Sequence, residues 1–471
     1  MIGYERETLA RLPLAEAAYR LLDYVSHEDV LNAIFQEHRG RSYAKVIDFP
    51  TLVQLVAAAL LEHRGSGHRS FARARAAGAL KTSLKAAYGK LARVPLPLSQ
   101  ALLAETSQRL LEVRPRAAAS TLPACLHGLT VLLVDGKKIK HVAHRLKVLR
   151  PLRGQVLAAK LLLALNLETG LAVAFSAHPD GEAGETPLVP ALLAQTRPRT
   201  PGPRLWVLDR AFCDLTQPPL LSAAGDHFLI RYSAKVSFEA DPARPARSGT
   251  DAAGRPYREE WGWLGGGAHP RRQYVRRITL PRAAAEAVVL VTDLLDAERY
   301  PAADLLTVYR DRWGIEQVFQ QITEVFHLRR LIGSTPQAGV FQAAFCLLLY
   351  NVLVVIRAFL SAARPEPAVA PAAISTATLF DDMHRDLVAL HEVLAVPEIV
   401  AAFAERLPGQ ELRRYLSGRL AGVWSATWTK APTKPRSAAK KTTTYLKGGH
   451  DSVYRLLQKS ARRAVRHPRR Q

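Results

Sequence analysis

Hydrophobic residues follow two different patterns along the chain, and the pattern changes near residue 128. Between residues 8 and 115 apolar side chains recur every three or four positions, as in LPLAEAAYRLLDYV, which predicts a series of amphipathic helices. After residue 128 apolar residues form short runs that end at a charge or a turn, as in GLTVLLVDGKKIK, AKLLLALNLETGLAVAFSAHP and RLWVLDRAFCD, which predicts strands. The order of three strands, helix, strand, helix and strand predicts a mixed α/β sheet flanked by helices.

The pattern changes again after the last of these strands. Residues 234–300 are rich in Gly, Pro and Arg and alternate in RQYVRRITL, which predicts a β-rich insertion, and helical spacing then returns from 302 to about 420. The run AAFCLLLYNVLVVI is shorter than the ~20 residues that cross a bilayer and contains Asn351, so it predicts a buried helix. We therefore expect a helical domain at 1–120, the first part of an α/β core at 121–233, the insertion at 234–300, the rest of the core with C-terminal helices at 301–420, and a basic, disordered tail at 421–471.

The net charge of the chain indicates which class of molecule it binds. The chain carries 65 Lys and Arg against 41 Asp and Glu, a formal net charge of +24, and 48% of its residues are hydrophobic, which excludes a disordered basic polymer. Residues 430–471 hold 13 of the cations and one acid. Basic connectors such as HRGSGHRSFARAR suit a nucleic-acid backbone, because Lys and Arg release its counterions; the alternative is a solvated surface. The three scattered cysteines exclude a disulfide framework and a closed zinc site. The N-terminus lacks the pattern of a secretory signal, so we expect a cytoplasmic protein.

Three acidic residues stand where the chain stops being apolar or presents a distinctive helical face. Asp135 ends the run VLLV, Asp209 ends the run WVL, and Glu316 lies within VYRDRWGIEQVF. Carboxylates at the ends of adjacent strands, with a third from a neighbouring helix, supply the oxygen ligands that Mg²⁺ and Mn²⁺ prefer. Two such ions can activate an attacking oxygen and stabilise the leaving oxygen in a displacement at phosphorus. The alternative is that each Asp is a helix cap or turn residue.

The helix predicted around Glu316 has a mixed polar face. Tyr309, Arg312 and Glu316 are offset by 0, 3 and 7 residues, which places them within about 60° of one another around a helix. Arginine can bind a phosphate through two parallel hydrogen bonds, and tyrosine can donate a hydrogen bond or stack beside it. The alternative is an Arg312–Glu316 ion pair on an exposed surface.

The strings VDGKKIK, VLDRAFCD and DLLTVYRDRWGIEQVFQQITEVFHLRRLIGSTP resemble the DDE transposases of bacterial insertion sequences, in the IS-four family. The resemblance covers roughly residues 8–360. It implies an α/β fold with an RNase H-like mixed sheet core, a helical N-terminal domain and a β-rich insertion. It also implies that Asp135, Asp209 and Glu316 are the catalytic residues and hold two ions, Mg²⁺ or Mn²⁺. The implied activity is transposition: metal-dependent cleavage at the element's terminal inverted repeats, then strand transfer.

The same resemblance implies DNA-binding residues and partners. The family signature is Tyr, Arg, Glu and Lys with gaps of two, three and six residues, but the lysine position here is Thr323. The implied phosphate contacts are Tyr309 and Arg312, with the Thr323 hydroxyl or Arg330 in place of the lysine. The expected partners are double-stranded DNA, both element ends and target, and a second copy in a synaptic homodimer, in the bacterial cytoplasm near the nucleoid and with no membrane partner.

Aromatic and basic residues of the insertion are further DNA-binding candidates. Trp261 or Trp263 could stack on an extruded base, and Arg276, with its neighbouring arginines, could line a backbone groove. The alternative for the tryptophans is the core of a small β domain. Two other functions remain open: a catalytically inactive DNA-binding protein derived from a transposase, which the missing lysine favours, and a stand-alone nuclease on the same fold.

Overall fold

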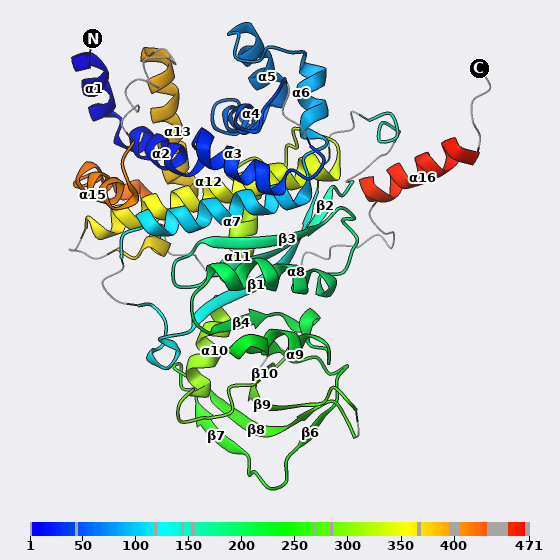
Figure 1. Ribbon diagram of the computed structural model, residues 1–471. Coiled ribbons are helices and arrows are strands. Elements are labelled where there is room, and N and C mark those ends of the chain that lie inside the picture. The colour runs from blue at the N-terminus through cyan, green and yellow to red at the C-terminus, as the bar shows by residue number, and fades with distance from the viewer. Residues whose placement is uncertain are drawn as a thin grey trace.

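The computed structural model describes residues 2–42, 46–116, 120–140, 142, 146–151, 156–267, 269–282, 286–364, 369–394, 406–430 and 451–466. The first part is helical and forms the upper end of the molecule in Figure 1. Side chains of Asp48, Ser66 and Ser83 accept hydrogen bonds from the backbone of the first turn and so begin three of these helices. The predicted helical start is confirmed, as α1 (Ile2–Arg11), α2 (Pro13–Ser26), α3 (Glu28–His38), α4 (Phe49–Leu61), α5 (Gly67–Ala76), α6 (Leu84–Leu91) and α7 (Leu96–Val113).

A mixed sheet forms the centre of the molecule. Its first five strands lie in the order β3-β2-β1-β4-β5, with β1, β2 and β3 antiparallel and β1, β4 and β5 parallel. The predicted sequence of strands and helices is confirmed, and so is the mixed α/β class of the sheet. The elements are β1 (Thr130–Ile139), β2 (Ala159–Asn166), β3 (Ala172–His178), α8 (Val189–Thr196), β4 (Arg204–Leu208), α9 (Gln217–Leu221) and β5 (His227–Arg231).

The β-rich insertion extends this same sheet. β10 pairs antiparallel with β5, and the order continues as β10-β9-β8-β6, with β7 paired to β8. The insertion therefore lies directly beside the parallel strands, at the lower end of the molecule in Figure 1. Its strands are β6 (Phe238–Ala240), β7 (Arg247–Thr250), β8 (Pro256–Leu264), β9 (Gln273–Leu280) and β10 (Val288–Thr292).

Helices cover both faces of the core sheet. Side chains alternate along a strand, so Leu133 and Ile139 of β1 join one hydrophobic core while Leu132 and Val134 join the other. The first core contains α7 and the helices that follow the insertion; the second contains α8. The later helices are α10 (Ala302–Asp311), α11 (Trp313–Glu324), α12 (Pro336–Ala362), α13 (Thr376–Val393) and α15 (Gly409–Arg419).

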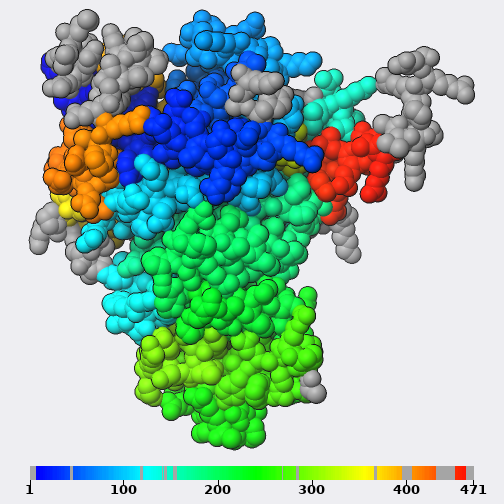
Figure 2. Space-filling model, in the orientation of Figure 1, coloured from blue at the N-terminus to red at the C-terminus, as the bar shows by residue number. Residues whose placement is uncertain are grey.

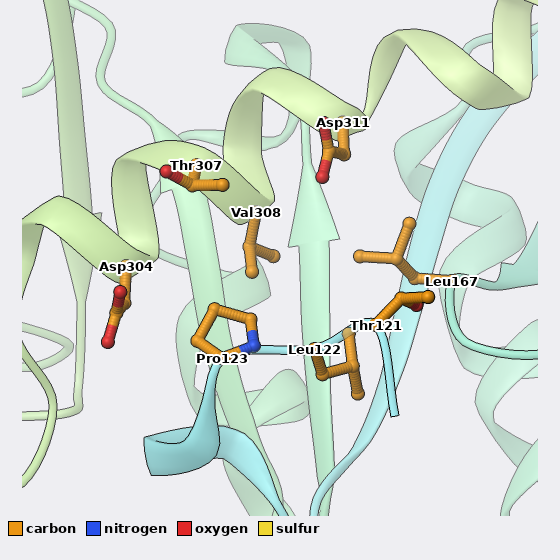
Figure 3. A pocket seen from close by; sticks show the side chains of 8 residues that line it. All are labelled: Thr121, Leu122, Pro123, Leu167, Asp304, Thr307, Val308 and Asp311. Atoms are coloured by element: carbon orange, nitrogen blue, oxygen red, sulfur yellow. The ribbon is translucent and has the colours of Figure 1, made fainter. Parts of the chain in front are cut away.

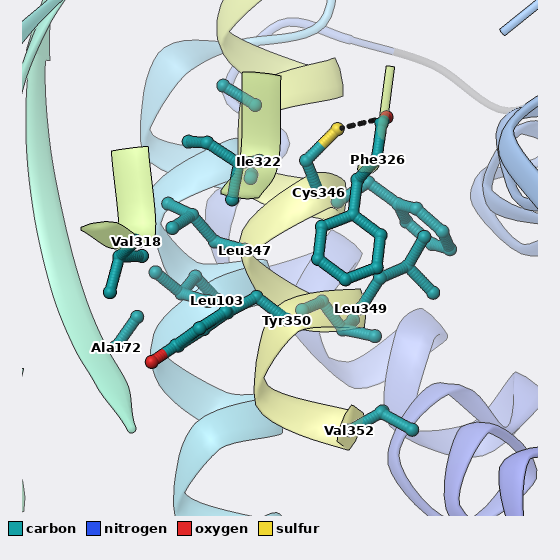
Figure 4. Close-up of a cluster of buried hydrophobic side chains, with 14 of the residues drawn as sticks. Leu103, Ala172, Val318, Ile322, Phe326, Cys346, Leu347, Leu349, Tyr350 and Val352 are labelled. Carbon is teal, nitrogen blue, oxygen red and sulfur yellow. Dashed lines mark hydrogen bonds between the residues drawn. The ribbon is translucent and has the colours of Figure 1, made fainter. Parts of the chain in front are cut away.

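Helix α12 runs through the larger core. Its 27 residues are long and apolar enough to cross a membrane, yet its apolar stretch is completely buried among the other helices, as the sequence predicted. The Asn351 side chain hydrogen-bonds to Ser107 of α7 and to both backbone groups of Ala172 in β3. Val318 and Ile322 of α11 pack beside it (Figure 4). These contacts fix α11 against the sheet, which positions Glu316.

Part of the expected tail is ordered helix. Residues 451–453 hydrogen-bond to Leu157 before β2, and helix α16 (Val453–Arg466) follows and projects from the body in Figure 2. Val453 is buried, and Arg455 donates to Asp180 at 2.7 Å. This apolar and ionic anchor differs from the disordered tail expected for this segment; residues 431–450 and 467–471 lie outside the described residues.

Candidate active site

Asp135 and Asp209 occupy neighbouring positions on two parallel strands. The β1–β4 ladder ends where Val134 lies opposite Leu208, and the two aspartates are the next residues on their strands. The β4–β5 ladder ends at the same level, which places Arg231, the last residue of β5, next in the row. Strand register therefore brings together two carboxylates that are 74 positions apart in the sequence.

Glu316 enters the site from α11. The sequence suggested one continuous helix, but α10 ends at Asp311 and α11 begins at Trp313, so the helix is interrupted at Arg312. The backbone N–H of Arg312 bonds to the carbonyl of Tyr309 three residues back, in place of the four-residue spacing of an α-helix. Tyr309, Arg312 and Glu316 still face the strand ends.

Two side chains link the three carboxylates. Arg312 lies 3.5 Å from Asp135 Oδ2 and 3.1 Å from Glu316 Oε1, and the Tyr309 hydroxyl donates to Asp209 Oδ1 at 3.2 Å. The Arg312 side chain is only 11% exposed, so its pair with Glu316 is not a surface ion pair. The structure thus brings together all three predicted catalytic residues with Tyr309 and Arg312.

Burial shapes the electrostatics of the site and favours the neutral forms of two of its side chains. Burial raises the pKa of Asp135 to about 6, although the Gly136 N–H and Arg312 act in the opposite direction. Burial and the Asp209 carboxylate raise the pKa of Tyr309 to about 12, so its hydroxyl remains a hydrogen-bond donor at neutral pH. A partly buried carboxylate with a raised pKa is stabilised when a cation binds beside it.

The donor set suits a divalent cation, because three carboxylates offer the hard oxygen ligands of Mg²⁺ and Mn²⁺. Within the described part of the chain, however, no three His, Cys, Asp or Glu side chains lie close enough to share one ion. Arg312 stands between Asp135 and Glu316. The described contacts leave the second oxygen of Asp209 and of Glu316 without a partner. These residues fit a metal provided that the arginine moves away from the carboxylates.

Two charged residues beside Asp135 were not among the sequence candidates. Lys137 lies two residues further along β1 and on the same face, so strand alternation could have identified it. Glu185 packs against the opposite face of β1, where a Cβ at Gly136 would overlap its carboxylate, and it pairs with Lys160 at 2.5 Å. Glu185 lies in a loop segment, and no pattern in the sequence indicates this contact.

Neither residue expected to replace the signature lysine touches the carboxylates. The Thr323 hydroxyl donates to the carbonyl of Phe319 in its own helix at 2.6 Å. Arg330 is exposed, and its side chain reaches the carbonyl of Arg64 at 3.5 Å, in the loop before α5. Thr323 shares the helical face of Glu316, but its hydroxyl is already used.

The insertion residues occupy different surroundings from those expected. Trp261 is 1% exposed, donates to the carbonyl of Leu295 at 2.9 Å and has Arg244 4.1 Å above its ring. Arg276 is fully buried and donates to Glu259 at 2.5 Å. The prediction that Trp261 stacks on a base and that Arg276 lines a DNA groove is corrected here, because neither side chain is accessible.

Trp263 is partly exposed. Its ring meets Tyr274 edge to face at 5.0 Å and lies under the Arg272 guanidinium at 4.1 Å. It is not brought near the carboxylates, since it lies on β8, beyond β5, β10 and β9 in the sheet order.

A separate pocket lies on the other side of α10. Figure 3 shows Asp304, Thr307, Val308 and Asp311 projecting from this helix towards the segment at 121–123. None of the three site carboxylates lines it. Burial raises the pKa of Asp311, and Asp304 accepts a hydrogen bond from Cys125 at 3.3 Å. The pocket is therefore distinct from the carboxylate site.

Residues 127–352 match the family model of the transposase DDE domain. The match begins just before β1 and ends within α12, so it contains the carboxylate site and the insertion, while most of the helical N-terminal part lies outside it. No curated protein sequence matches the chain significantly. Among solved structures the chain is similar to a piggyBac transposase synaptic complex with hairpin DNA, determined by cryo-EM, at 10% identity and a TM-score of 0.34, over 92% of this chain and 88% of that chain.

Proposed function

We propose that this protein is a DDE transposase of the IS-four family, which cleaves DNA at the ends of its own element and joins those ends to target DNA. It acts as a homodimer in the bacterial cytoplasm, with Asp135, Asp209 and Glu316 as the catalytic residues. The match of residues 127–352 to the transposase DDE domain supports the reaction class. The net charge of +24 supports a DNA partner.

The observation that carries the proposal is the convergence of three carboxylates around Arg312. Register places Asp135 beside Asp209, and Arg312 contacts both Asp135 and Glu316. By contrast, Arg276 and Glu259 in the insertion form a buried pair of one cation and one acid. A cluster of three carboxylates in which one has a raised pKa is typical of a functional site.

The three carboxylates would hold two Mg²⁺ or Mn²⁺ ions, which when bound activate the attacking oxygen and stabilise the leaving oxygen at phosphorus. Arg312 exchanges its carboxylate partners for a DNA phosphate, to which its guanidinium can donate two parallel hydrogen bonds. Tyr309 keeps its proton and either orients Asp209 or donates to an adjacent phosphate oxygen. Burial of Arg312 excludes water from these contacts and strengthens them.

The decisive experiment uses the full chain, Mg²⁺ and a labelled duplex that carries the inverted repeat flanking the gene. Asp135→Asn, Asp209→Asn and Glu316→Gln should each lower the rate of cleavage by at least ~10⁴-fold, since the metal site is lost. Binding of the duplex, measured by gel shift with Ca²⁺ in place of Mg²⁺, should change by less than about threefold. Glu260→Gln, a carboxylate of the insertion, is the matched control and should cleave at the wild-type rate.

The products separate the alternatives. Strand-transfer products joined at the 3′ end of the repeat support a transposase. Cleavage without joining and without preference for the repeat supports a nuclease. Binding with no cleavage in either Mg²⁺ or Mn²⁺ supports an inactive DNA-binding derivative. Wild-type activity in all three carboxylate variants would overturn the assignment of the site.

A further inference from the structure

Lys137 extends from β1 into the space between that strand and α11. It lies two residues beyond Asp135, and residues two apart on a strand share a face. Its amino group lies 5.4 Å from the ring centre of Phe319, which is one turn after Glu316 on α11. A lysine ammonium therefore stands beside the carboxylate site, over an aromatic ring that the catalytic helix presents.

Lys137 forms no direct ion pair among the described residues, although the nearby carboxylates of Asp135 and Glu324 favour its charged form. Its neighbour on the other face, Lys138, pairs with Glu182 at 3.0 Å, and Lys160 on β2 pairs with Glu185 at 2.5 Å. The contact recorded for Lys137 is the face of Phe319. A largely buried ammonium that no carboxylate contacts directly is costly to maintain, unless an anion completes the contact at some stage of function.

Helix α11 supplies no cation of its own. Its sequence, WGIEQVFQQITE, contains Glu316 and Glu324 but neither Lys nor Arg. The Thr323 hydroxyl is bonded to its own helix, and Arg312 is held by Asp135 and Glu316. A phosphate that approaches along α11 would therefore meet acidic residues from the helix, and a positive charge from the facing strand.

We propose that Lys137 binds a backbone phosphate of the DNA strand that is cleaved, next to the scissile phosphate, and holds that strand against α11. The inference rests on the proposed function and names one further positioning residue for it. The ammonium offers three donors and a compact charge to the phosphate, while the Phe319 ring supports its aliphatic stem. Lys138 cannot take this role, since it points to the opposite face and pairs with Glu182.

The test measures single-turnover cleavage of the labelled repeat duplex by the full chain, with protein in excess. Lys137→Met keeps the length and apolar character of the stem and should lower the rate by about 10–100-fold, the value of one charge-assisted hydrogen bond. Lys137→Arg should retain most of the rate, because it keeps the charge. Lys138→Met is the matched control and should remain within about threefold of wild type.

Neutral phosphates separate a phosphate contact from a structural effect. In duplexes with one methylphosphonate at successive positions around the cleavage site, one position should slow wild type by a similar factor. The same position should slow Lys137→Met no further, because the contact is already lost. A lysine one turn beyond Phe319 can reach the same space, so Thr323→Lys should restore part of the rate in the Lys137→Met protein.

Two results would overturn the inference. One is cleavage by Lys137→Met at the wild-type rate; the other is additive losses at every methylphosphonate position, which indicates that the lysine acts on structure alone. These differ from failure of the proposed function, in which neither wild type nor Lys138→Met cleaves the repeat in Mg²⁺ or Mn²⁺, and the inference then falls with it.

Discussion

Arg276 of the insertion pairs with one glutamate, Glu259, whereas beyond the end of the β1–β4 ladder Arg312 is shared by two carboxylates, Asp135 and Glu316, with Asp209 beside them. Both regions are built from the same residue types, arginine, acid and aromatic side chains. Arg276 is fully buried and its glutamate lies on the neighbouring strand, so this pair holds β8 and β9 together. At the ladder end one arginine is divided between two acids and Asp135 has a raised pKa, so the carboxylates remain able to bind a cation. The way in which the acids and arginines are paired, more than the residue types, distinguishes the structural ion pair of the insertion from the candidate active site.

The largest effect on stability is expected when one partner of the buried ion pair in the insertion is removed. Arg276→Met leaves Glu259 buried and unpaired, which should lower the free energy of unfolding by about 3–5 kcal/mol. Urea denaturation of the metal-free protein measures this. Adding Glu259→Gln should recover much of the loss, because the buried charge is then removed.

If Arg276→Met were as stable as wild type but bound DNA more weakly, the groove role expected from the sequence would be restored. We expect the reverse: below its melting temperature the variant should bind the repeat duplex as wild type does.

The sequence predicted the carboxylate site better than the insertion for a physical reason. Asp135 and Asp209 both follow apolar runs, and this local pattern predicted that both lie at the edge of a buried sheet. Their adjacency comes from the register that pairs Val134 with Leu208, while β1 itself continues to Ile139. Arg276 and Arg312 look alike in sequence, yet one is enclosed between strands and the other faces three acids. Which acid meets which arginine depends on cross-strand register and on packing of distant segments, and short-range patterns do not contain that information.

Some features of the fold could likewise be predicted from local patterns, whereas others depend on contacts between distant segments. Helical periodicity predicted α2, α4 and α12, because the spacing of apolar residues along the sequence shows whether one face of a helix or the whole helix is buried. The interruption at Arg312 and the docking of α16 through Asp180 depend on contacts between remote parts of the chain. The fit of Glu185 against Gly136 is of the same kind.

The second prediction concerns how the free energy of unfolding depends on pH through Asp135. The folded-state pKa of Asp135 is raised to about 6, above the ~3.9 of an unfolded chain, so the folded state binds this proton more tightly. Without metal, the ionised carboxylate should therefore destabilise the fold above pH 6, by up to about 3 kcal/mol, and this penalty should disappear as the pH falls towards 4.

Asp135→Asn should accordingly unfold at a higher urea concentration than wild type at pH 8 in EDTA, and lose that advantage at pH 4. Mg²⁺ should stabilise wild type and have little effect on the variant. A variant that is less stable than wild type at both pH values would show that Asp135 is a structural partner of Arg312, as the paired acids of the insertion are.

The smallest expected effect concerns Arg271, an exposed arginine of the insertion for which the described residues provide no ion pair. Arg271→Ala should leave the free energy of unfolding within about 0.5 kcal/mol of wild type. If this residue meets a DNA phosphate, binding should weaken by less than about fivefold for any duplex, and the slope of log affinity against log salt should fall by about one. Arg277→Ala is the comparison, because its guanidinium is already held by Glu260, which Arg258 also contacts, and its salt slope should not change. If both variants instead keep the wild-type slope, neither arginine meets the DNA backbone, and the cations that guide the strand to the carboxylates lie outside this part of the insertion.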